Sequence, residues 1–167
     1  HRRYDKALFA HKIELIKKLM PDAFIGVDVM VGCRGEKPEL FEECRDFLQS
    51  LDVTQLHVFP SSERPGTMAL KIPYIVDEAE KKRRSKQLLD MSEEKRIAFY
   101  QKYIGTTADV LFEKAVKGKA MHGFTANYVR VELSATKARE EYDNQIIKVK
   151  LLDFNHDKSA LKCEIIG

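Results

Sequence analysis

The sequence predicts an α/β fold followed by a small all-β barrel, and three observations support this prediction. Over residues 1–76, apolar residues at helical spacing alternate with short β-branched runs in the order helix, strand, helix, strand. This order is typical of parallel βα units joined by right-handed crossovers. Charges of both signs dominate residues 77–104 and indicate a solvated connecting helix. Over residues 105–167, apolar residues recur at every second position in short segments, as in small nucleic-acid-binding barrels.

Prolines bound the elements of residues 1–76. Pro21 closes the first helix, Pro38 suits the first turn of the second, and Pro60 ends the second strand because it has no N–H to donate. The first strand is apolar at nearly every position, so we expect it to be buried on both faces. The expected elements are a helix over 4–20, a strand over 23–31, a helix over 38–51 and a strand over 54–59, with loops over 32–36 and 60–76.

The connecting helix has clear start and stop signals. Asp77 is a suitable N-cap with Glu80 three residues later, and Gly105 can supply the left-handed residue after a helix that ends near 103. The basic run over 81–84 is either an exposed, solvated face or a patch that contacts phosphates. The strands expected after this helix cover 108–113, 128–133, 145–151 and 160–166.

Composition narrows the class of protein. The 167 residues contain three cysteines, which are far apart and odd in number, so we expect a reducing cytoplasm rather than a disulfide framework. No stretch approaches the roughly 20 apolar residues of a membrane span, and there is no signal-like leader, so we expect a cytoplasmic protein without a membrane partner. The net charge of +3 permits a nucleic-acid partner without requiring one.

We find no catalytic triad order, Walker loop or His-Glu-x-x-His motif, and we assign no catalytic or metal-binding residue.

Polar residues and glycines gather where the two predicted strands end. The segment over 28–36 reads DVMVGCRGE, and the segment over 57–69 reads HVFPSSERPGTMA. Because the carboxyl ends of parallel strands meet at one sheet edge, both segments are candidates for a binding site. His57 is either a packed core residue or a ligand contact, and Arg64 either holds a phosphate or forms a surface ion pair. Asp28 lies within an apolar strand, so we expect its carboxylate to have a partner.

These two segments resemble the closing part of the radical SAM methylthiotransferases, which carry DxIVGFPGE and HVFPYSxRxGTxA in this order. A basic helix and a C-terminal TRAM domain follow in that family, and HGFTANYV over 122–129 is similar to the TRAM hairpin GxTxNYxxV. The resemblance covers nearly the whole chain. The chain departs from the family pattern in two places: Cys33-Arg34 stands where Phe-Pro is usual, and Ser61 stands where Tyr is usual.

The resemblance implies the C-terminal βα units of an incomplete TIM-like barrel over 1–76, a connecting helix over 77–104 and a TRAM barrel over 105–167. It implies S-adenosylmethionine and [4Fe–4S] clusters in the full-length enzyme, although no Cys-x-x-x-Cys-x-x-Cys occurs here. We therefore expect a C-terminal fragment that is inactive alone, has the missing N-terminal half as a partner and self-associates through exposed strand edges. The residues that the resemblance places at the cofactor are Val31, Gly32, Gly35, Glu36, His57, Val58 and Phe59.

The implied activity is transfer of a methylthio group to C2 of N6-threonylcarbamoyladenosine at position 37 of tRNA. The alternatives are the isopentenyl-adenosine branch, the branch that modifies an aspartate of a ribosomal protein, and a non-catalytic RNA-binding module. The partner we expect is a tRNA anticodon stem-loop, because aromatic residues stack on unpaired bases and basic residues neutralise phosphates. Phe124 and Tyr128 alternatively fill the barrel core. The residues expected to bind RNA are Arg64, Lys114, Phe124, Asn127, Tyr128 and Arg130.

Overall fold

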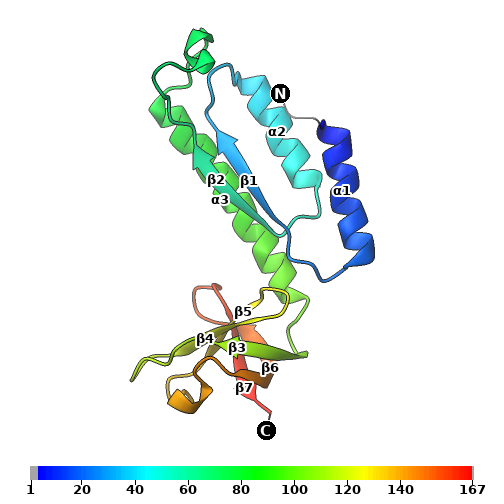
Figure 1. Ribbon diagram of the computed structural model, residues 1–167, viewed down its shortest axis with the longest axis vertical. Helices are drawn as coiled ribbons and strands as arrows, with labels where there is room; N and C mark the ends of the chain where they lie inside the picture. The colour runs from blue at the N-terminus through cyan, green and yellow to red at the C-terminus, as the bar shows by residue number, and fades with distance from the viewer. Residues whose placement is uncertain (1–3, 167) are drawn as a thin grey trace. The chain divides into compact units, whose positions relative to one another are not determined.

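The computed structural model describes residues 4–166 (Figure 1). Contacts within the chain divide it into two compact units, residues 1–96 and 97–167. The first unit contains a two-stranded parallel sheet with helices, and the second contains a closed barrel of five strands. An α/β unit followed by a small barrel is the architecture that the sequence predicts.

The first unit alternates helices and strands. Its elements are α1 (Lys6–Leu19), β1 (Gly26–Val31), α2 (Pro38–Ser50), β2 (Gln55–Pro60), the 3-10 helix η1 (Met68–Lys71) and most of α3 (Glu78–Gln101). The strands β1 and β2 pair in parallel over their whole length. The four helices and strands expected before residue 60 are all present, although β1 begins three residues later than expected.

The helices cover one face of this sheet. Buried side chains of the strands pack with buried side chains of all three helices in a single core. Its buried members are Ile13, Val29, Val31, Phe41, Leu48, Leu51, Val53, Leu56, Leu88 and Met91. The alternate residues of β1 are exposed, so the prediction of a strand buried on both faces is wrong. Apolar side chains lie on both faces of β1, but the described residues bury only one of them.

Side chains complete the ends of the helices. Asp5 accepts from the backbone N–H of Leu8 at the start of α1 (2.9 Å), and Asp77 accepts from that of Glu80 at the start of α3 (2.8 Å). These bonds satisfy donors that have no partner within a helix. At the C-terminal end of α2, the ammonium group of Lys95 in α3 donates to the carbonyl oxygens of Gln49 and Leu51. Residue 77 therefore caps α3 as predicted.

The second unit is a barrel with strand order β3-β4-β5-β7-β6. Its elements are β3 (Thr107–Phe112), β4 (Met121–Thr125), β5 (Arg130–Leu133), η2 (Glu140–Tyr142), β6 (Ile146–Phe154) and β7 (Leu161–Ile165). The pairs are antiparallel except β5 with β7. The sequence did not predict β4 as a strand. The strand expected from residue 128 begins at Arg130, because Tyr128 has a positive φ of 63° and lies in a turn.

Buried aliphatic and aromatic side chains fill the barrel. The interior residues are Val110, Phe112, Met121, Val129, Val131, Leu133, Val149, Leu151, Leu161 and Cys163. Phe124 and Tyr128 are outside this core, since Tyr128 is 65% exposed and Phe124 is half-buried. Among residues 4–166, no helix is long and apolar enough to cross a membrane.

Candidate functional site

The loops that follow β1 and β2 lie next to each other at one edge of the sheet. The backbone N–H of Ser61 donates to the carbonyl oxygen of Val31 over 2.8 Å, and Val31 is in register with Pro60. The parallel pairing makes this edge the carboxyl end of both strands, where ligands bind in open α/β sheets. The two segments that carry the family resemblance therefore form one candidate site.

The uncovered face of the sheet leads to this edge. Met30 is in register with Phe59, and their side chains are 61% and 53% exposed. Asp28 is in register with His57, and both are exposed. The interpretation of His57 as a core residue is therefore wrong, and Asp28, being exposed, does not require the partner that the sequence suggested. The imidazole lies over Gly26, where an added Cβ would be 3.2 Å from Nε2 of His57.

The loop over 32–36 is fixed by a carboxylate. Oε2 of Glu36 accepts from the backbone N–H of Gly32 (2.6 Å) and from Nη1 of Arg84 (2.9 Å), and Arg84 also donates to the carbonyl oxygen of Glu36 (2.8 Å). Gly32 has a φ of +76°, and an added Cβ would lie 2.4 Å from Cγ of Lys81. Only glycine fits there without a shift, because both the backbone conformation and the space exclude a side chain.

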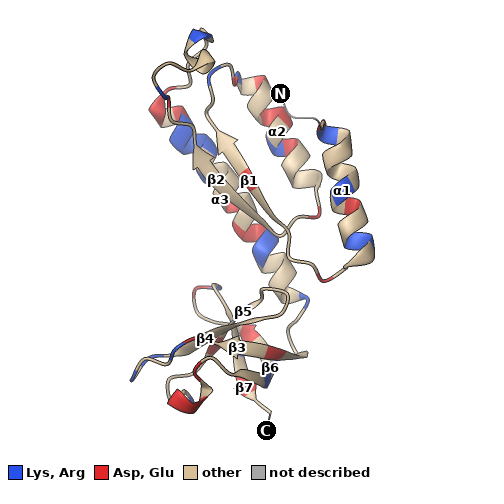
Figure 2. Ribbon diagram, in the orientation of Figure 1, with Lys and Arg blue, Asp and Glu red and all other residues tan. Residues whose placement is uncertain are grey.

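The basic run at the start of α3 is divided between surface and interior. Arg84 is fully buried and Lys81 is 8% exposed, whereas Lys82 and Arg83 are exposed. The sequence allowed the run to be a solvated face or a phosphate-contacting patch, and both alternatives require exposed side chains. Both are therefore wrong for Lys81 and Arg84. Figure 2 shows bands of both charge signs along α3. The spacing of 81 and 84 to the core residues at 88 and 91 is helical, and it is the signal that places these two side chains on the buried face.

Arg83 and Arg84 share the carboxylate of Glu80. Arg83 donates to both of its oxygens at 2.7 Å, and Nε of Arg84 donates to Oε1 at 2.7 Å. These charge-assisted bonds, with that of Arg83 the larger cause, lower the pKa of Glu80 from 4.5 to about 2. The guanidinium of Arg84 also lies 5.0 Å from the ring centroid of Phe41. Glu80 thus stays ionised and holds both arginines.

Arg34 ties the loop after β2 to the loop after β1. Its guanidinium donates to both carboxylate oxygens of Glu63, at 2.6 and 3.1 Å, and to the carbonyl oxygens of Leu70 and Ile72. Arg34, like Cys33 and Ser61, is a residue that departs from the family pattern. Arg34 therefore forms four hydrogen bonds across the site, to residues that are 29 to 38 positions away in the sequence.

The structure separates the predicted cofactor residues into three groups. His57 and Phe59 present side chains on the uncovered face. The side chains of Val31 and Val58 pack in the core with the helices instead of on the uncovered face. The third group, Gly32, Gly35 and Glu36, belongs to a loop held by the bond from the Gly32 N–H to Glu36 and by one from the Gly35 N–H to the carbonyl oxygen of Tyr74 (2.9 Å), outside the loop. Met30, which the sequence analysis did not select, lies beside Phe59.

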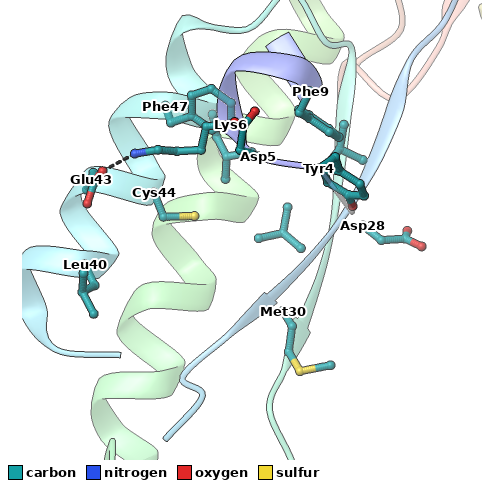
Figure 3. Close-up of a pocket in the computed structure, with 13 residues that line it drawn as sticks. Tyr4, Asp5, Lys6, Phe9, Asp28, Met30, Leu40, Glu43, Cys44 and Phe47 are labelled. Carbon is teal, nitrogen blue, oxygen red and sulfur yellow. Dashed lines mark hydrogen bonds and ion pairs between the residues drawn. The ribbon is translucent and has the colours of Figure 1, made fainter. Parts of the chain in front are cut away.

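A groove lies along the edge of β1 that faces away from β2 (Figure 3). It has a volume of about 630 Å³, and α1, α2 and β1 contribute its lining, which is mostly apolar. Phe9 and Phe47 lie at one end, with the ion pair of Lys6 and Glu43 nearby. Among residues 4–166, no strand pairs with this edge of β1. Sequence spacing alone could not locate the groove, since it depends on which strand edges stay unpaired.

In the barrel, the hairpin between β4 and β5 brings four predicted residues together. The rings of Phe124 and Tyr128 lie 5.8 Å apart between centroids. Oγ1 of Thr125 donates to Oδ1 of Asn127 (2.7 Å) and accepts from the Val129 N–H (2.9 Å). Asn127 therefore shapes the turn that exposes Tyr128.

A row of outward side chains crosses four strands of the barrel. Ile146 is in register with Leu111, Leu111 with Phe124, and Phe124 with Arg130. Ile146 is 71% and Leu111 is 47% exposed, and neither was selected from the sequence. Nε of Arg130 is buried without a hydrogen-bond partner in the described structure. The strand alternation shows that these residues face outward, but only the register shows that they align.

The remaining predicted RNA-binding residues lie apart from this row. Lys114 is exposed just after β3. Arg64 is exposed in the loop of the first unit, and its carbonyl oxygen accepts from the backbone N–H (3.4 Å) and the hydroxyl (2.9 Å) of Thr67. The structure therefore groups four of the six predicted residues.

The cysteines do not form a metal site. Cys33 and Cys44 are in the first unit, and Cys163 is inside the barrel. Burial, with a smaller contribution from Glu132, raises the pKa of Cys163 to about 12, and burial also raises that of Cys44. Within residues 4–166, no group of three His, Cys, Asp or Glu side chains is placed to hold a metal ion. The residues described here do not fit an iron–sulfur cluster, which needs closely spaced thiolates.

Known proteins resemble the chain over most of its length. It is 32% identical over 155 residues, 90% of the chain, to the threonylcarbamoyladenosine tRNA methylthiotransferase MtaB of Bacillus subtilis. It is 32% identical over 160 residues, 93% of the chain, to the tRNA-2-methylthio-N(6)-dimethylallyladenosine synthase of Finegoldia magna. The MtaB protein of Thermotoga maritima is 27% identical over 97% of the chain.

No protein-family model matches the chain. The matched regions are 34%, 33% and 36% of these three relatives, so the chain spans about a third of their length. Relatives with both names match across both units of the chain. The chain belongs to the methylthiotransferase family.

Proposed function

We propose that this chain supplies the cofactor-facing sheet edge and the RNA-binding barrel of a tRNA methylthiotransferase. The observation that carries the proposal is the hydrogen bond between Ser61 and Val31, which joins the two family segments at one edge. The names of the relatives, all tRNA-modifying enzymes, support the substrate class. Such an enzyme acts where tRNA is found, so we expect it in the cytoplasm.

The uncovered sheet face fits the adenosyl part of S-adenosylmethionine. Met30 and Phe59 form an exposed apolar floor suited to adenine, and His57 and Asp28 offer hydrogen-bonding groups two residues away on the same face. Sites of this kind combine an apolar lining with a few polar groups. When bound beside an iron–sulfur cluster, the cofactor supplies the radical chemistry. The residues of this chain bind and orient it, and the cluster ligands belong to the part of the protein outside these 167 residues.

The barrel provides a surface for unpaired bases. Phe124 presents its ring from β4 and Tyr128 from the turn that follows, and both backbones are fixed, so little conformational freedom is lost on stacking. Arg130 lies in register with Phe124 and supplies positive charge beside the rings, and exposed Lys114, just after β3, adds a second cation on the barrel. We infer that this surface contacts the anticodon stem-loop.

We favour N6-threonylcarbamoyladenosine as the substrate base, because the residues of the segment over 56–69 resemble the motif of the branch that acts on this base. Relatives of the dimethylallyladenosine branch are equally similar, at 32% identity. The base modified in cells distinguishes the two branches. Modification of a ribosomal protein instead of tRNA would place the chain in the third branch.

We infer that the free edge of β1 and the groove beside it receive a further βα unit of the same protein. Helix α1 precedes β1. In a βα unit with a right-handed crossover, the strand before such a helix pairs in parallel with the strand after it, here β1. The apolar lining of the groove and the threefold greater length of the relatives support this inference. In the chain alone, the same edge is available for self-association.

Binding measurements on the full-length protein test the proposal. We expect it to bind S-adenosylmethionine in calorimetry and an anticodon stem-loop in fluorescence anisotropy, with RNA affinity that falls steeply with salt. Amides of β1 should exchange with deuterium more slowly in the full-length protein than in the 167-residue chain. RNA binding without cofactor binding would favour a non-catalytic RNA-binding module, and binding of neither would refute the proposal.

A further inference from the structure

The loop over 32–36 is joined to α3 by one carboxylate oxygen. Oε2 of Glu36 lies 2.6 Å from the Gly32 N–H and 2.9 Å from Nη1 of Arg84. The same Nη1 lies 2.8 Å from the carbonyl oxygen of Glu36. The first and last residues of the loop are therefore both fixed relative to one arginine, which is 48 residues away in the sequence.

Burying the charged side chain of Arg84 is energetically unfavourable. Arg84 is 0% exposed, and its Nη2 is buried without a hydrogen-bond partner in the described structure. A buried ion pair contributes little net stability, because removing both charges from water offsets their attraction. An apolar side chain would fill this position beside Phe41 at lower cost. What an apolar residue could not do is hold the two oxygens of Glu36.

Lys81 holds the neighbouring loop from the same face of α3. Its Nζ donates to the carbonyl oxygen of Ser61 (3.3 Å) and to Glu78 (2.8 Å), and its stem fills the space that a side chain at Gly32 would need. Lys81 and Arg84 are one helical turn apart. Both strand-exit loops are thus fixed by buried cations of one helix.

We propose that Arg84 is a positioning residue that acts through Glu36 to hold the 32–36 loop in the conformation that receives the adenosyl cofactor. The inference rests on the function proposed for this sheet edge. It assigns α3, which contributes no residue to the uncovered face, a role in shaping the site. Arg84 itself does not contact the cofactor.

The matched variants are Arg84→Met and Arg83→Met in the full-length protein. Both remove an arginine that binds Glu80, but only Arg84 reaches Glu36. We expect Arg84→Met to speed deuterium exchange in peptides that cover the 32–36 loop and to weaken S-adenosylmethionine binding by about tenfold, as for the loss of one charge-assisted hydrogen bond. Arg83→Met should leave both quantities near their wild-type values. Arg84→Lys should recover part of the affinity, since one donor is restored.

Two further comparisons keep the result decisive. If Arg84→Met fails to fold, Glu36→Gln removes the charge but keeps one acceptor, and it should also speed exchange of the loop. Equal exchange and equal affinity in the Arg84 and Arg83 variants would overturn the positioning role. Wild-type protein that does not bind S-adenosylmethionine would instead refute the proposed function, while the exchange data would still show whether Arg84 orders the loop.

Discussion

The carbonyl oxygen of Leu111 lies 2.6 Å from the position that a Cβ at Gly123 would occupy. Gly123 is in register with Phe112 of β3, so the two strands approach where only a hydrogen atom fits. This contact explains why a strand interior contains glycine despite its conformational cost. It also gives Gly123, the glycine of the hairpin segment over 122–129, a packing role rather than a binding role.

Replacing this glycine should separate β3 from β4. We expect Gly123→Ala to lower the free energy of unfolding by about 1–3 kcal/mol, the usual cost of overpacking, in urea denaturation of the chain. Gly118 provides the control, because its φ is +75° and no atom lies within 4 Å of its added Cβ. Asparagine tolerates that conformation, so Gly118→Asn should be nearly neutral. A neutral Gly123→Ala would contradict the close approach.

Tyr128 should be the main aromatic contact for RNA. Its ring is exposed on a fixed turn, and stacking on one base is worth about 1–3 kcal/mol. Tyr128→Ala should therefore weaken binding of an anticodon stem-loop by roughly tenfold or more, measured by fluorescence anisotropy. Tyr128→Phe should bind normally, since the ring is kept. Equal affinity of the alanine variant and the wild type would show that bases do not stack on this residue.

Glu80 should make stability depend on acid pH. Its folded pKa of about 2 is below the ordinary value of 4.5, so the folded state favours the ionised form. The resulting stabilisation is complete above pH 4.5 and is lost as the pH falls toward 2. Glu80→Gln should show a smaller loss of unfolding free energy over this range than the wild type. Identical slopes for Glu80→Gln and the wild type would contradict the assignment.

Cys163 should resist alkylation in the folded barrel. Burial raises its pKa to about 12, and the thiolate is the reactive form. With iodoacetamide at pH 8, mass spectrometry should find Cys33, in its partly exposed loop, modified well before Cys163. Denaturant should abolish the difference. Rapid modification of Cys163 without denaturant would show that the barrel opens readily.

The sequence predicted the elements where local chemistry decides them. Pro38 begins α2 and Asp77 caps α3 as expected, because these features depend on a few neighbouring residues. It did not show that Met30 and Phe59 are exposed, since apolar residues on both faces of a strand suggest burial on both. The contact of Arg84 with Glu36 was also not predictable from the sequence. Its partner Glu36 is 48 positions away, and a run of basic residues resembles a solvated surface until the helix is packed.

The nucleosides of cellular tRNA test the central claim most directly. We expect deletion of the gene that encodes this chain to abolish the 2-methylthio form of N6-threonylcarbamoyladenosine, with accumulation of the unmodified base, as measured by mass spectrometry. The full-length gene should restore the modification, and the 167-residue chain alone should not. Methylthiolated nucleosides at unchanged levels in the deletion strain would contradict the account.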